Sequence, residues 1–581
     1  MTKPVYLWAA IATAVPLGLS VYAGFRRDAR AATETDYLIS GQTVSADDYA
    51  NTSVGYALQM AAVFLFADWG AHYGLGALWA PAFWCLGFGL LYWLLPKFLP
   101  YREKDTPMTL HEYLARSVGG SRRVQIVASL ATVLGLAGTL MNEVDYTLAV
   151  YQPVVGSGRW ALALSAVFLL VGMSYVLAHG FKAEVVAERV QMRIAYIGVV
   201  SALVLSLAFV WHRATPETYR HVELGLLVTL GLMAAAKVNV RGRPRTLKAL
   251  FPDTQILIPV AGAAVVVWQR QYLQLLPRGS VASVLETPIA GQLSAQGWLG
   301  VFSLLVANAL WMPVDLATWQ RVEAVDGSDG RALERLRAGT LRVLIESPAS
   351  WGLGVVLGWM LNAGGFVPAS GDTSQALAAY ATALADGSRT ADVPWGGLLV
   401  YVPLVAGCVA VMLSTISGLL TAIGYTAYRD LLPSRERTIG RARIWTVGIL
   451  LVSWVGFEGL RRVAGANLAT LLYGAYAMQL ALFVTVIITL RRARGSEPGA
   501  FASVCFGIAA SLVCTGFAAY TQAEALYVLP PVLAVAFAAV AYVFGHALER
   551  SSDAEPGPPG HARALPGTEH GAPQPAPGAG A

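Results

Sequence analysis

The stretch Val411–Leu432, VMLSTISGLLTAIGYTAYRDLL, is an apolar helix that carries three hydroxyl side chains near its start. These are Ser414, Thr415 and Ser417, and the helix runs into the charged segment Arg429–Arg443, where a membrane span has to stop. Serine and threonine in membrane helices commonly bond back to a carbonyl one turn earlier. The alternative is that adjacent Ser414 and Thr415 direct their oxygens at a cation such as sodium, because hard cations prefer oxygen ligands.

The composition is typical of a polytopic membrane protein. Of the 581 residues, 56% are apolar and only 13% are charged, whereas charged residues make up about a quarter of a soluble domain. The basic residues Arg26, Arg27 and Arg30 follow the first apolar stretch, so no cleavable signal peptide is predicted. The sequence has no nucleophile–base spacing, phosphate loop or cluster of metal ligands. We therefore expect no enzyme, no cofactor and no nucleic-acid partner, and a lipid bilayer as the surroundings.

Apolar runs of about 20 residues are long enough to cross a bilayer. Two shorter runs, Leu224–Ala236 and Ile256–Trp268, have 13 residues each and form either two further spans or a shallow hairpin. We predict an all-α polytopic membrane protein with 13–15 transmembrane helices. The thirteen longer runs lie at 5–25, 50–70, 77–99, 124–150, 160–178, 190–211, 298–318, 339–362, 396–425, 443–460, 467–490, 500–521 and 525–546.

The basic clusters between the spans fall on one side of the membrane when the spans alternate. This predicts an N-terminus outside and a C-terminus in the cytoplasm, and we expect the bacterial inner membrane as the location. The segment 364–397 is then a large outer loop. Residues 551–581 are rich in proline, glycine and alanine and predict a disordered cytoplasmic tail.

Two spans contain residues that interrupt a helix. Asn51–Tyr56 is small, hydroxylated and contains glycine, and the span 298–318 contains Pro313 and Asp315. Discontinuous helices at corresponding places in two halves indicate a transporter binding site, although a packing face of small residues is the alternative for the first. We predict two inverted five-helix repeats, each beginning with one of these broken helices. The predicted division of the chain is 1–49 an extra helix and loop, 50–211 the first repeat, 212–297 an insertion, 298–490 the second repeat, 491–550 two further helices, and 551–581 the tail.

The fourth span holds a group of polar residues: Asn142, Glu143, Asp145 and Tyr146. A charged side chain costs roughly 2.5–3.5 kcal/mol at the centre of a membrane helix, so its presence calls for an explanation. One carboxylate could lie at the outer interface in contact with water. The functional alternative is that Glu143 or Asp145 takes part in proton coupling.

Five motifs occur in one order between residues 36 and 431, and together they resemble the sodium/solute symporter family. This family contains the sodium-coupled sugar, proline, monocarboxylate and iodide carriers. The motifs are Asp36-Tyr37-Leu38 to Gly41 with Tyr73–Trp79, then Thr109–Leu114, Gly180–Ala183 with Glu188 and Gln191, Asp315 to Gln320-Arg321, and Ser414–Ser417 with Asp430-Leu431.

The resemblance implies broken first and sixth core helices and a sodium site between the first and eighth core helices. Hydroxyl ligands would come from Ser414 and Thr415, and backbone carbonyl ligands from Gly55 and Leu58. The sequence departs from the family at Ala57, where an Asp or Asn is frequent, and Gln59 follows two residues later. The carbonyl ligands survive this change, whereas a side-chain ligand does not.

We therefore predict a secondary active transporter that couples sodium to the symport of a small organic solute by alternating access. Proton coupling through Glu143 or Asp145 is one alternative. The other is a solute sensor that acts through a partner protein, because a fold does not fix a function. The candidate solute ligands project from the broken helices and the wall around them: Gln59, Asn142, Tyr146, Asn308, Trp311 and Asp315.

Overall fold

The computed structural model describes most of the chain, and within it the described residues are helical apart from turns and one isolated bridge between Val44 and Val325. The predicted short runs 224–236 and 256–268, most of the outer loop and the tail from residue 555 lie outside the described residues. The described residues are 3–101, 107–155, 159–213, 295–363, 366, 376–377, 379–382, 395–464, 468–492, 495–521 and 524–554.

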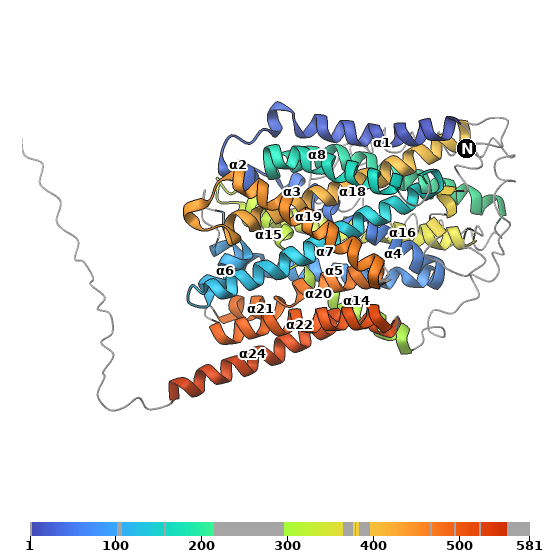
Figure 1. Ribbon diagram of the computed structural model, residues 1–581. Coiled ribbons are helices and arrows are strands. Elements are labelled where there is room, and N and C mark those ends of the chain that lie inside the picture. Colours follow the sequence, from blue (N-terminus) through green and yellow to red (C-terminus); the bar gives the residue numbers. More distant parts are fainter. Residues whose placement is uncertain are drawn as a thin grey trace, which may run out of the picture.

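The long helices lie side by side in one bundle, with α1 along one edge and α24 along the opposite edge (Figure 1). In chain order they are α1 (Lys3–Gly24), α2 (Glu34–Ile39), α3 (Ala46–Ala57), α4 (Met60–Tyr73), α5 (Trp79–Phe98), α6 (Leu110–Ser117), α7 (Arg122–Val155), α8 (Arg159–Arg213), α14 (Ala295–Trp311), α15 (Leu316–Ala324), α16 (Ala332–Ala363), α18 (Trp395–Thr426), α19 (Ile439–Ala464), α20 (Leu468–Leu480), α21 (Phe483–Arg492), α22 (Glu497–Thr521), α23 (Glu524–Tyr527) and α24 (Pro530–Ala554).

The helices confirm an all-α membrane protein. Among the described residues, eleven helices are long and apolar enough to span a bilayer, and the bent pair α3–α4 adds a twelfth. Helix α8 contains two of the predicted spans, 160–178 and 190–211, and its backbone turns between them at Gly180. Across that turn, the Gln191 amide donates a hydrogen bond to the Tyr175 hydroxyl (3.0 Å). The predicted span 467–490 is interrupted at Ala481 and Leu482, between α20 and α21.

Both predicted breaks are present, but the first lies later in the sequence than expected. The segment Asn51–Tyr56 is regular helix within α3, and the break falls at Leu58 and Gln59, where α3 and α4 meet at 59°. Small residues therefore did not unwind α3. The second break separates α14 from α15 over Met312–Asp315 and includes the predicted Pro313, which cannot donate a backbone hydrogen bond.

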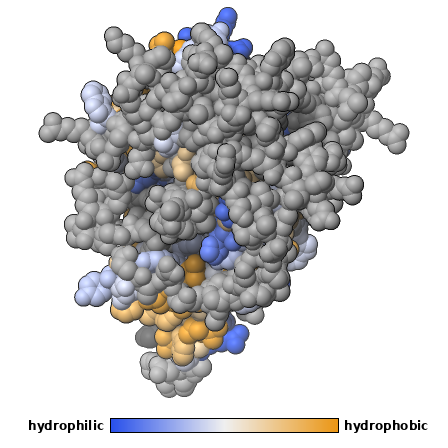
Figure 2. Space-filling view, turned by 90° about the vertical axis from the view of Figure 1, so that its right-hand side faces the viewer, coloured by the Kyte–Doolittle hydropathy of each residue, from blue (hydrophilic) through white to orange (hydrophobic). Residues whose placement is uncertain are grey.

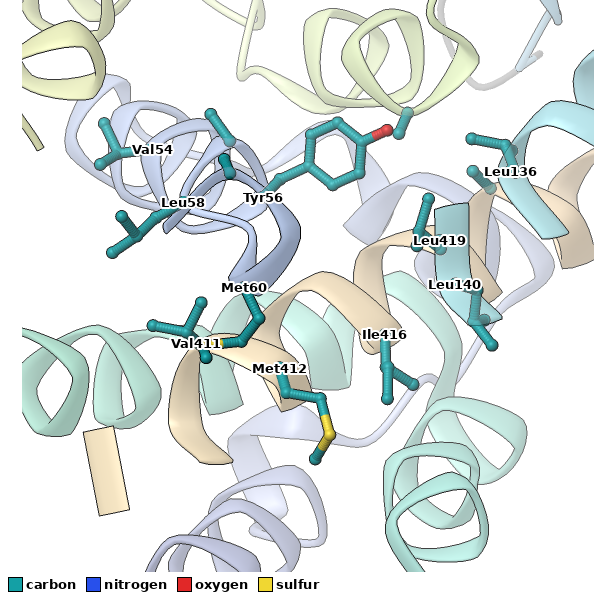
Figure 3. Close-up of a cluster of buried hydrophobic side chains, with 14 of the residues drawn as sticks. Val54, Tyr56, Leu58, Met60, Leu136, Leu140, Val411, Met412, Ile416 and Leu419 are labelled. Atoms are coloured by element: carbon teal, nitrogen blue, oxygen red, sulfur yellow. The ribbon is translucent and has the colours of Figure 1, made fainter. Parts of the chain in front are cut away.

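Among the spans that the structure describes, α18 is the most enclosed: every residue of its most apolar window is buried, compared with a third of the window in α22 and α24. Figure 3 shows Met60, just after the break, beside Val411 of α18, and both residues line one pocket. The helices at the opposite edge expose apolar side chains instead, and Figure 2 shows an apolar surface at the end of the molecule where α22 and α24 lie. Such a surface is suited to contact with lipid.

At one end of the bundle, which we call the basic end, ion pairs fix the start of the first broken helix. Arg189 donates two hydrogen bonds to Asp48 (2.8 and 2.9 Å), and Arg342 donates to Asn51 (2.6 Å). Lys182 lies 3.2 Å from Asp36. Partial burial acts to raise the pKa of Asp36, but backbone N–H donors and the Lys182 ammonium outweigh it and lower the pKa. These contacts tie the first half of the broken helix to α8 and α16.

At the same end, the short helix α6 is docked on the last turn of the α18 span. Thr109 and Glu112 form a capping box that starts α6. The buried Asp430 then accepts hydrogen bonds from Thr109 (2.7 Å) and Gln125 (2.9 Å) and lies 2.7 Å from a ring nitrogen of His111. The motif at residues 109–114 thus supplies both the cap that starts α6 and side chains that hydrogen-bond this helix to Asp430.

The turn inside α8 provides a test of the fold. Gly180 has φ of 63°, and a Cβ there would lie 2.1 Å from the Tyr37 carbonyl oxygen. We expect Gly180→Ala to destabilise the protein by more than about 2 kcal/mol, since the side chain meets both a left-handed backbone and fixed main chain. Thermal unfolding in detergent should show a lower midpoint.

The matched control for this substitution is Gly448→Ala. Gly448 lies inside α19, and a Cβ there meets nothing within 4 Å. Alanine is the better helix former, so the midpoint should stay unchanged or rise. Equal midpoints for Gly180→Ala and Gly448→Ala would contradict the described turn.

Candidate functional site

The first break exposes peptide groups in the middle of the bundle. The Gln59 N–H donates to the Ala57 carbonyl (2.9 Å), which leaves the carbonyl of Gly55 outside the helical ladder. The Trp351 indole N–H, from α16, also donates to the Ala57 carbonyl (2.9 Å). The last turn of α3 therefore departs from the regular helical pattern at Gly55, and the assignment of its carbonyl as a sodium ligand stays a prediction.

A buried carboxyl lies between this break and α18. The Ser414 hydroxyl donates to Oε1 of Glu188, and Oε2 of Glu188 has no hydrogen-bond partner. A Cβ at Gly55 would lie 1.6 Å from Oε1 of Glu188 and 2.8 Å from the Ser414 hydroxyl. Only glycine leaves space for the carboxyl at this point, so Gly55, Glu188 and Ser414 form one compact group from α3, α8 and α18.

The neighbouring hydroxyl makes a different contact. Thr415 donates to the Val411 carbonyl one turn earlier (3.2 Å), the contact common in membrane helices. Leu58 is buried at the break. Their assignment as sodium ligands stays a prediction, and the carboxyl of Glu188 is an additional oxygen donor that was not assigned as a ligand from the sequence.

A second carboxyl one turn away is paired with a buried arginine. Arg321 lies 2.5 Å from Glu184, and both side chains are at most 1% exposed. Thr421 also donates to Glu184, and the Arg321 guanidinium lies 4.5 Å from the centre of the Tyr56 ring. A buried guanidinium is tolerated only with such a partner, so this pair ties α8 to α15 below the break.

Asp315 connects the second break to the first. Its carboxylate caps the start of α15 by accepting from the Thr318 N–H (2.8 Å), and it accepts from the Tyr56 hydroxyl of α3 (3.0 Å). With Glu184 and Glu188 it makes three acidic groups beside Arg321, the one basic group that the described part of the chain brings to this cluster. If ionised, this cluster carries an excess of negative charge, which favours a cation.

On the other side of the break, two amides and two aromatic rings form a connected cluster. The Tyr476 hydroxyl donates to the Gln59 carbonyl oxygen (2.5 Å), and the Trp311 indole donates to the Gln479 carbonyl oxygen (3.2 Å). The rings of Trp311 and Tyr476 lie 5.0 Å apart. The amide nitrogens of both glutamines are buried without a hydrogen-bond partner. We call these four residues the amide–aromatic cluster.

The other predicted solute ligands lie around this cluster. Asn142 donates to the Gly138 carbonyl (3.0 Å), and its own carbonyl oxygen is buried without a partner. The Asn308 amide nitrogen is also buried without a partner. The Tyr146 ring lies 5.2 Å from the Phe64 ring on α4. Asn142 and Tyr146 lie on α7 and Asn308 lies on α14, and their assignment as solute ligands stays a prediction.

Glu143 occupies a separate position at the start of α4. Its two oxygens accept from the backbone N–H groups of Met60 (2.7 Å) and Ala61 (3.0 Å), and the side chain is fully buried. Asp145, by contrast, is half-buried. The two carboxyls that the sequence grouped together are therefore in different surroundings.

An apolar pocket adjoins the break on the α16 and α18 side. Its walls come from α4, α8, α16 and α18, and no charged side chain lines it. Met60 and Val63 form the wall on α4, and Leu404 and Cys408 form the wall on α18. The break thus has a polar cluster toward α20 and an apolar pocket toward α18.

Comparison with known proteins supports the architecture. No family model matches the sequence, and no curated protein matches it. A solved structure of a Na+-coupled sialic acid symporter, in a substrate-bound outward-open state, matches with a TM-score of 0.58 and 14% identity, covering 94% of this chain and 98% of that chain. The chain has the fold of that symporter.

Two further structures match over similar lengths with much lower scores. MhsT in complex with L-phenylalanine covers 87% of this chain and 98% of its own at 14% identity, with a TM-score of 0.31. Mhp1, a nucleobase-cation-symport-1 family transporter, covers 89% and 95% at 11% identity, with a TM-score of 0.29. The assignment of the fold therefore rests on the first structure alone.

Several residues of the site were not predicted from the sequence, because they are distant in sequence from the hydroxyl residues Ser414 and Thr415. Glu184 and Glu188 lie in α8, more than 220 residues before Ser414, and Gln479 and Tyr476 lie in α20. Glu188 was noticed only as part of a motif. The sequence did contain an indication of their role, since Glu184 and Glu188 are one helical turn apart and therefore lie on the same face of a membrane helix, where charged side chains are costly.

The buried pair offers a direct test. Glu184→Gln leaves the Arg321 guanidinium buried without a charged partner, and we expect a loss of about 3–5 kcal/mol of stability. Chemical denaturation of the purified protein measures this loss. The control is Glu436→Gln, whose partner Arg441 is about half-exposed, and it should change stability by less than about 1 kcal/mol. Similar losses in the two variants would contradict the buried pair.

Proposed function

We propose that the protein is a secondary active transporter that couples sodium to the symport of a small organic solute. The observation that carries the proposal is the buried Glu188 carboxyl, which meets Ser414 of α18 where Gly55 of the broken helix leaves space for it. Polar groups at the break between two halves of a membrane helix are typical of ion and solute sites in transporters.

The residues present suit a sodium ion. The unpartnered Oε2 of Glu188, the Ser414 hydroxyl and the Gly55 carbonyl are oxygen ligands available from three helices. Thr415 and the Leu58 carbonyl complete the proposed ligand set by resemblance. Sodium bound there would supply positive charge that holds α3, α8 and α18 together, and this would stabilise the amide–aromatic cluster on the other side of the break. The solute ligands we propose are Gln59, Asn142, Tyr146, Asn308, Trp311 and Asp315.

The family and the orientation belong to the same proposal. The ordered motifs favour membership of the sodium/solute symporter family. The basic end of the bundle would face the cytoplasm of a bacterial cell, with the N-terminus of the chain outside and the protein in the inner membrane. In that orientation, the ion pair of Asp48 with Arg189 and the hydrogen bond from Arg342 to Asn51 close the cytoplasmic side of the broken helix, and transport to the inside requires these contacts to separate.

Proton coupling is the second candidate, and one observation favours a particular carboxyl for it. Both oxygens of Glu143 already accept backbone N–H groups, and Asp145 is half-buried, whereas Glu188 has an oxygen without a partner. Glu188 is therefore the residue we propose for a coupled proton. A solute sensor would bind the same ligands without moving them, so uptake separates it from both transporters.

The first experiment compares thermal unfolding of the purified protein in sodium chloride and in choline chloride. A ligand that binds only the folded state stabilises it by about 2.7 kcal/mol at a hundredfold excess over Kd. We expect sodium to raise the midpoint of the unchanged protein, and Ser414→Ala and Glu188→Gln to remove the rise. Ser417→Ala is the control, because its hydroxyl bonds to the Ser414 carbonyl in the same helix (3.0 Å) and should leave the sodium response intact.

Uptake into proteoliposomes distinguishes the candidates. Solute accumulation driven by a sodium gradient supports symport with sodium, and accumulation driven only by a proton gradient supports the second candidate. A solute that stabilises the protein in sodium but is never taken up supports the sensor. An unchanged sodium response in both Ser414→Ala and Glu188→Gln would refute the proposed ion site.

A further inference from the structure

The start of α4 is a binding position for an anion, and a side chain of the protein fills it. The first N–H groups of a helix have no carbonyl partner within the helix, and the helix dipole favours negative charge beside them. Gln59 precedes α4 but its side chain does not cap the helix. The Glu143 carboxylate, brought from α7, accepts from the N–H groups of Met60 and Ala61 instead.

We propose that Glu143 serves as a built-in anion at this position, and that the transported solute carries no negative charge. The second part rests on the proposed transport function, whereas the first does not. In a transporter with a broken helix, the positive end of the second half can receive an anionic group of the substrate. Here that end is already neutralised, so an anionic solute would have to displace Glu143 or lie beside it.

The surroundings offer no basic group to offset a second negative charge. Among the described residues of the cluster, the one basic side chain is Arg321, and Glu184 already pairs with it. The pocket on the other side of α4 has no charged side chain in its walls. An anion near Glu143 would therefore be repelled in a medium that screens charge poorly.

The unpartnered atoms of the wall instead suit an uncharged polar solute. The Trp311 indole can only donate, so Gln479 must turn its carbonyl oxygen toward it and its amide N–H groups away. The Gly138 carbonyl can only accept, so Asn142 must donate to it and leave its own carbonyl oxygen free. The wall thus contains unpartnered buried groups of both kinds, a donor at Gln479 and an acceptor at Asn142, and both are neutral.

The fixed orientations of the Gln479 and Asn142 amides indicate which solutes would fit. A carbonyl or hydroxyl oxygen would accept from Gln479, and an N–H or O–H group would donate to Asn142. Amides, lactams and polyols carry both kinds of group without charge. The amide nitrogen of Gln59, which is also buried without a partner, supplies a further donor beside the break.

Chemical rescue tests the built-in anion without knowledge of the solute. Glu143→Ala removes the carboxylate and leaves the N–H groups of Met60 and Ala61 unpaired. We expect a lower unfolding midpoint that choline acetate, compared with choline chloride at the same concentration, restores in large part, while acetamide, which has the same shape without charge, does not. The unchanged protein should respond to neither compound. An acetate response of equal size in the unchanged protein and in Glu143→Ala, or none in Glu143→Ala, would overturn the assignment.

The isosteric variant Glu143→Gln keeps the experiment informative if the alanine variant does not fold. Gln fills the same volume and accepts a hydrogen bond but carries no charge, so its midpoint should be lowered and acetate should not restore it, because no space is left. A midpoint equal to that of the unchanged protein would show that the negative charge has no role at the start of α4.

Matched solutes test the class on the unchanged protein in sodium. Each pair shares a skeleton and differs in charge: phenylacetamide and phenylacetate, glucose and glucuronate, uracil and orotate. We expect any stabilising compound to be the uncharged member of its pair. A stabilising carboxylate would contradict the inferred class. If the midpoint is insensitive to sodium while acetate rescues Glu143→Ala, the ion site of the proposed function fails and the built-in anion stands.

Discussion

A helix that breaks inside a membrane has to find partners for peptide groups that hydrocarbon cannot solvate. At Leu58 and Gln59 those partners come from distant parts of the chain. Glu143 of α7 accepts hydrogen bonds from two N–H groups at the start of α4, and Trp351 of α16 donates a hydrogen bond to the last carbonyl of α3. The break is therefore possible only because other helices carry the matching side chains, and it fixes their positions in return.

The charges around the break follow a related constraint. Arg321 is fully buried and is stable there because Glu184 pairs with it, but Glu188 has no basic group of its own. Three acids beside one base leave a site that gains from a cation. A cation bound at Glu188 would join α3, α8 and α18, three helices that no covalent segment holds together at this depth. Binding and the relative positions of these helices are then linked, as coupled transport requires.

The sequence predicts the helices well because hydropathy reports the solvent around each segment. Each of the thirteen long apolar runs has a helical counterpart, and Pro313 correctly predicts the second break, since a proline removes a specific hydrogen bond. The first break was placed at Asn51–Tyr56 on local propensity, yet these residues are helical and buried. Packing against α16 and α18 decides the conformation there, and no local pattern reports that packing.

The candidate site was less accessible to sequence reasoning, because its parts lie on different helices. Ser414 and Gly55 could be paired through a family resemblance, but Glu188 became a neighbour of both only in the folded chain. Likewise, Glu143 and Asp145 look equivalent in the sequence, being two residues apart. The helix places them on different faces, so one meets the start of α4 and the other is half-buried.

The two halves of the broken helix present opposite electrostatic ends at the same place. The end of α3 offers carbonyl oxygens, which suit a cation, and the start of α4 offers N–H groups, which suit an anion. The two ends have different neighbours: the Cα of Gly55, near the end of α3, lies against the Glu188 carboxyl, which has an unpartnered oxygen, whereas the α4 N–H groups are already bound to Glu143. The end of α3 is thus available to a bound cation, whereas the start of α4 is already occupied by the Glu143 carboxylate. Selectivity for the charge of the solute would then depend on the residue at position 143 more than on the helices, since the same backbone could receive an anion if that carboxylate were absent.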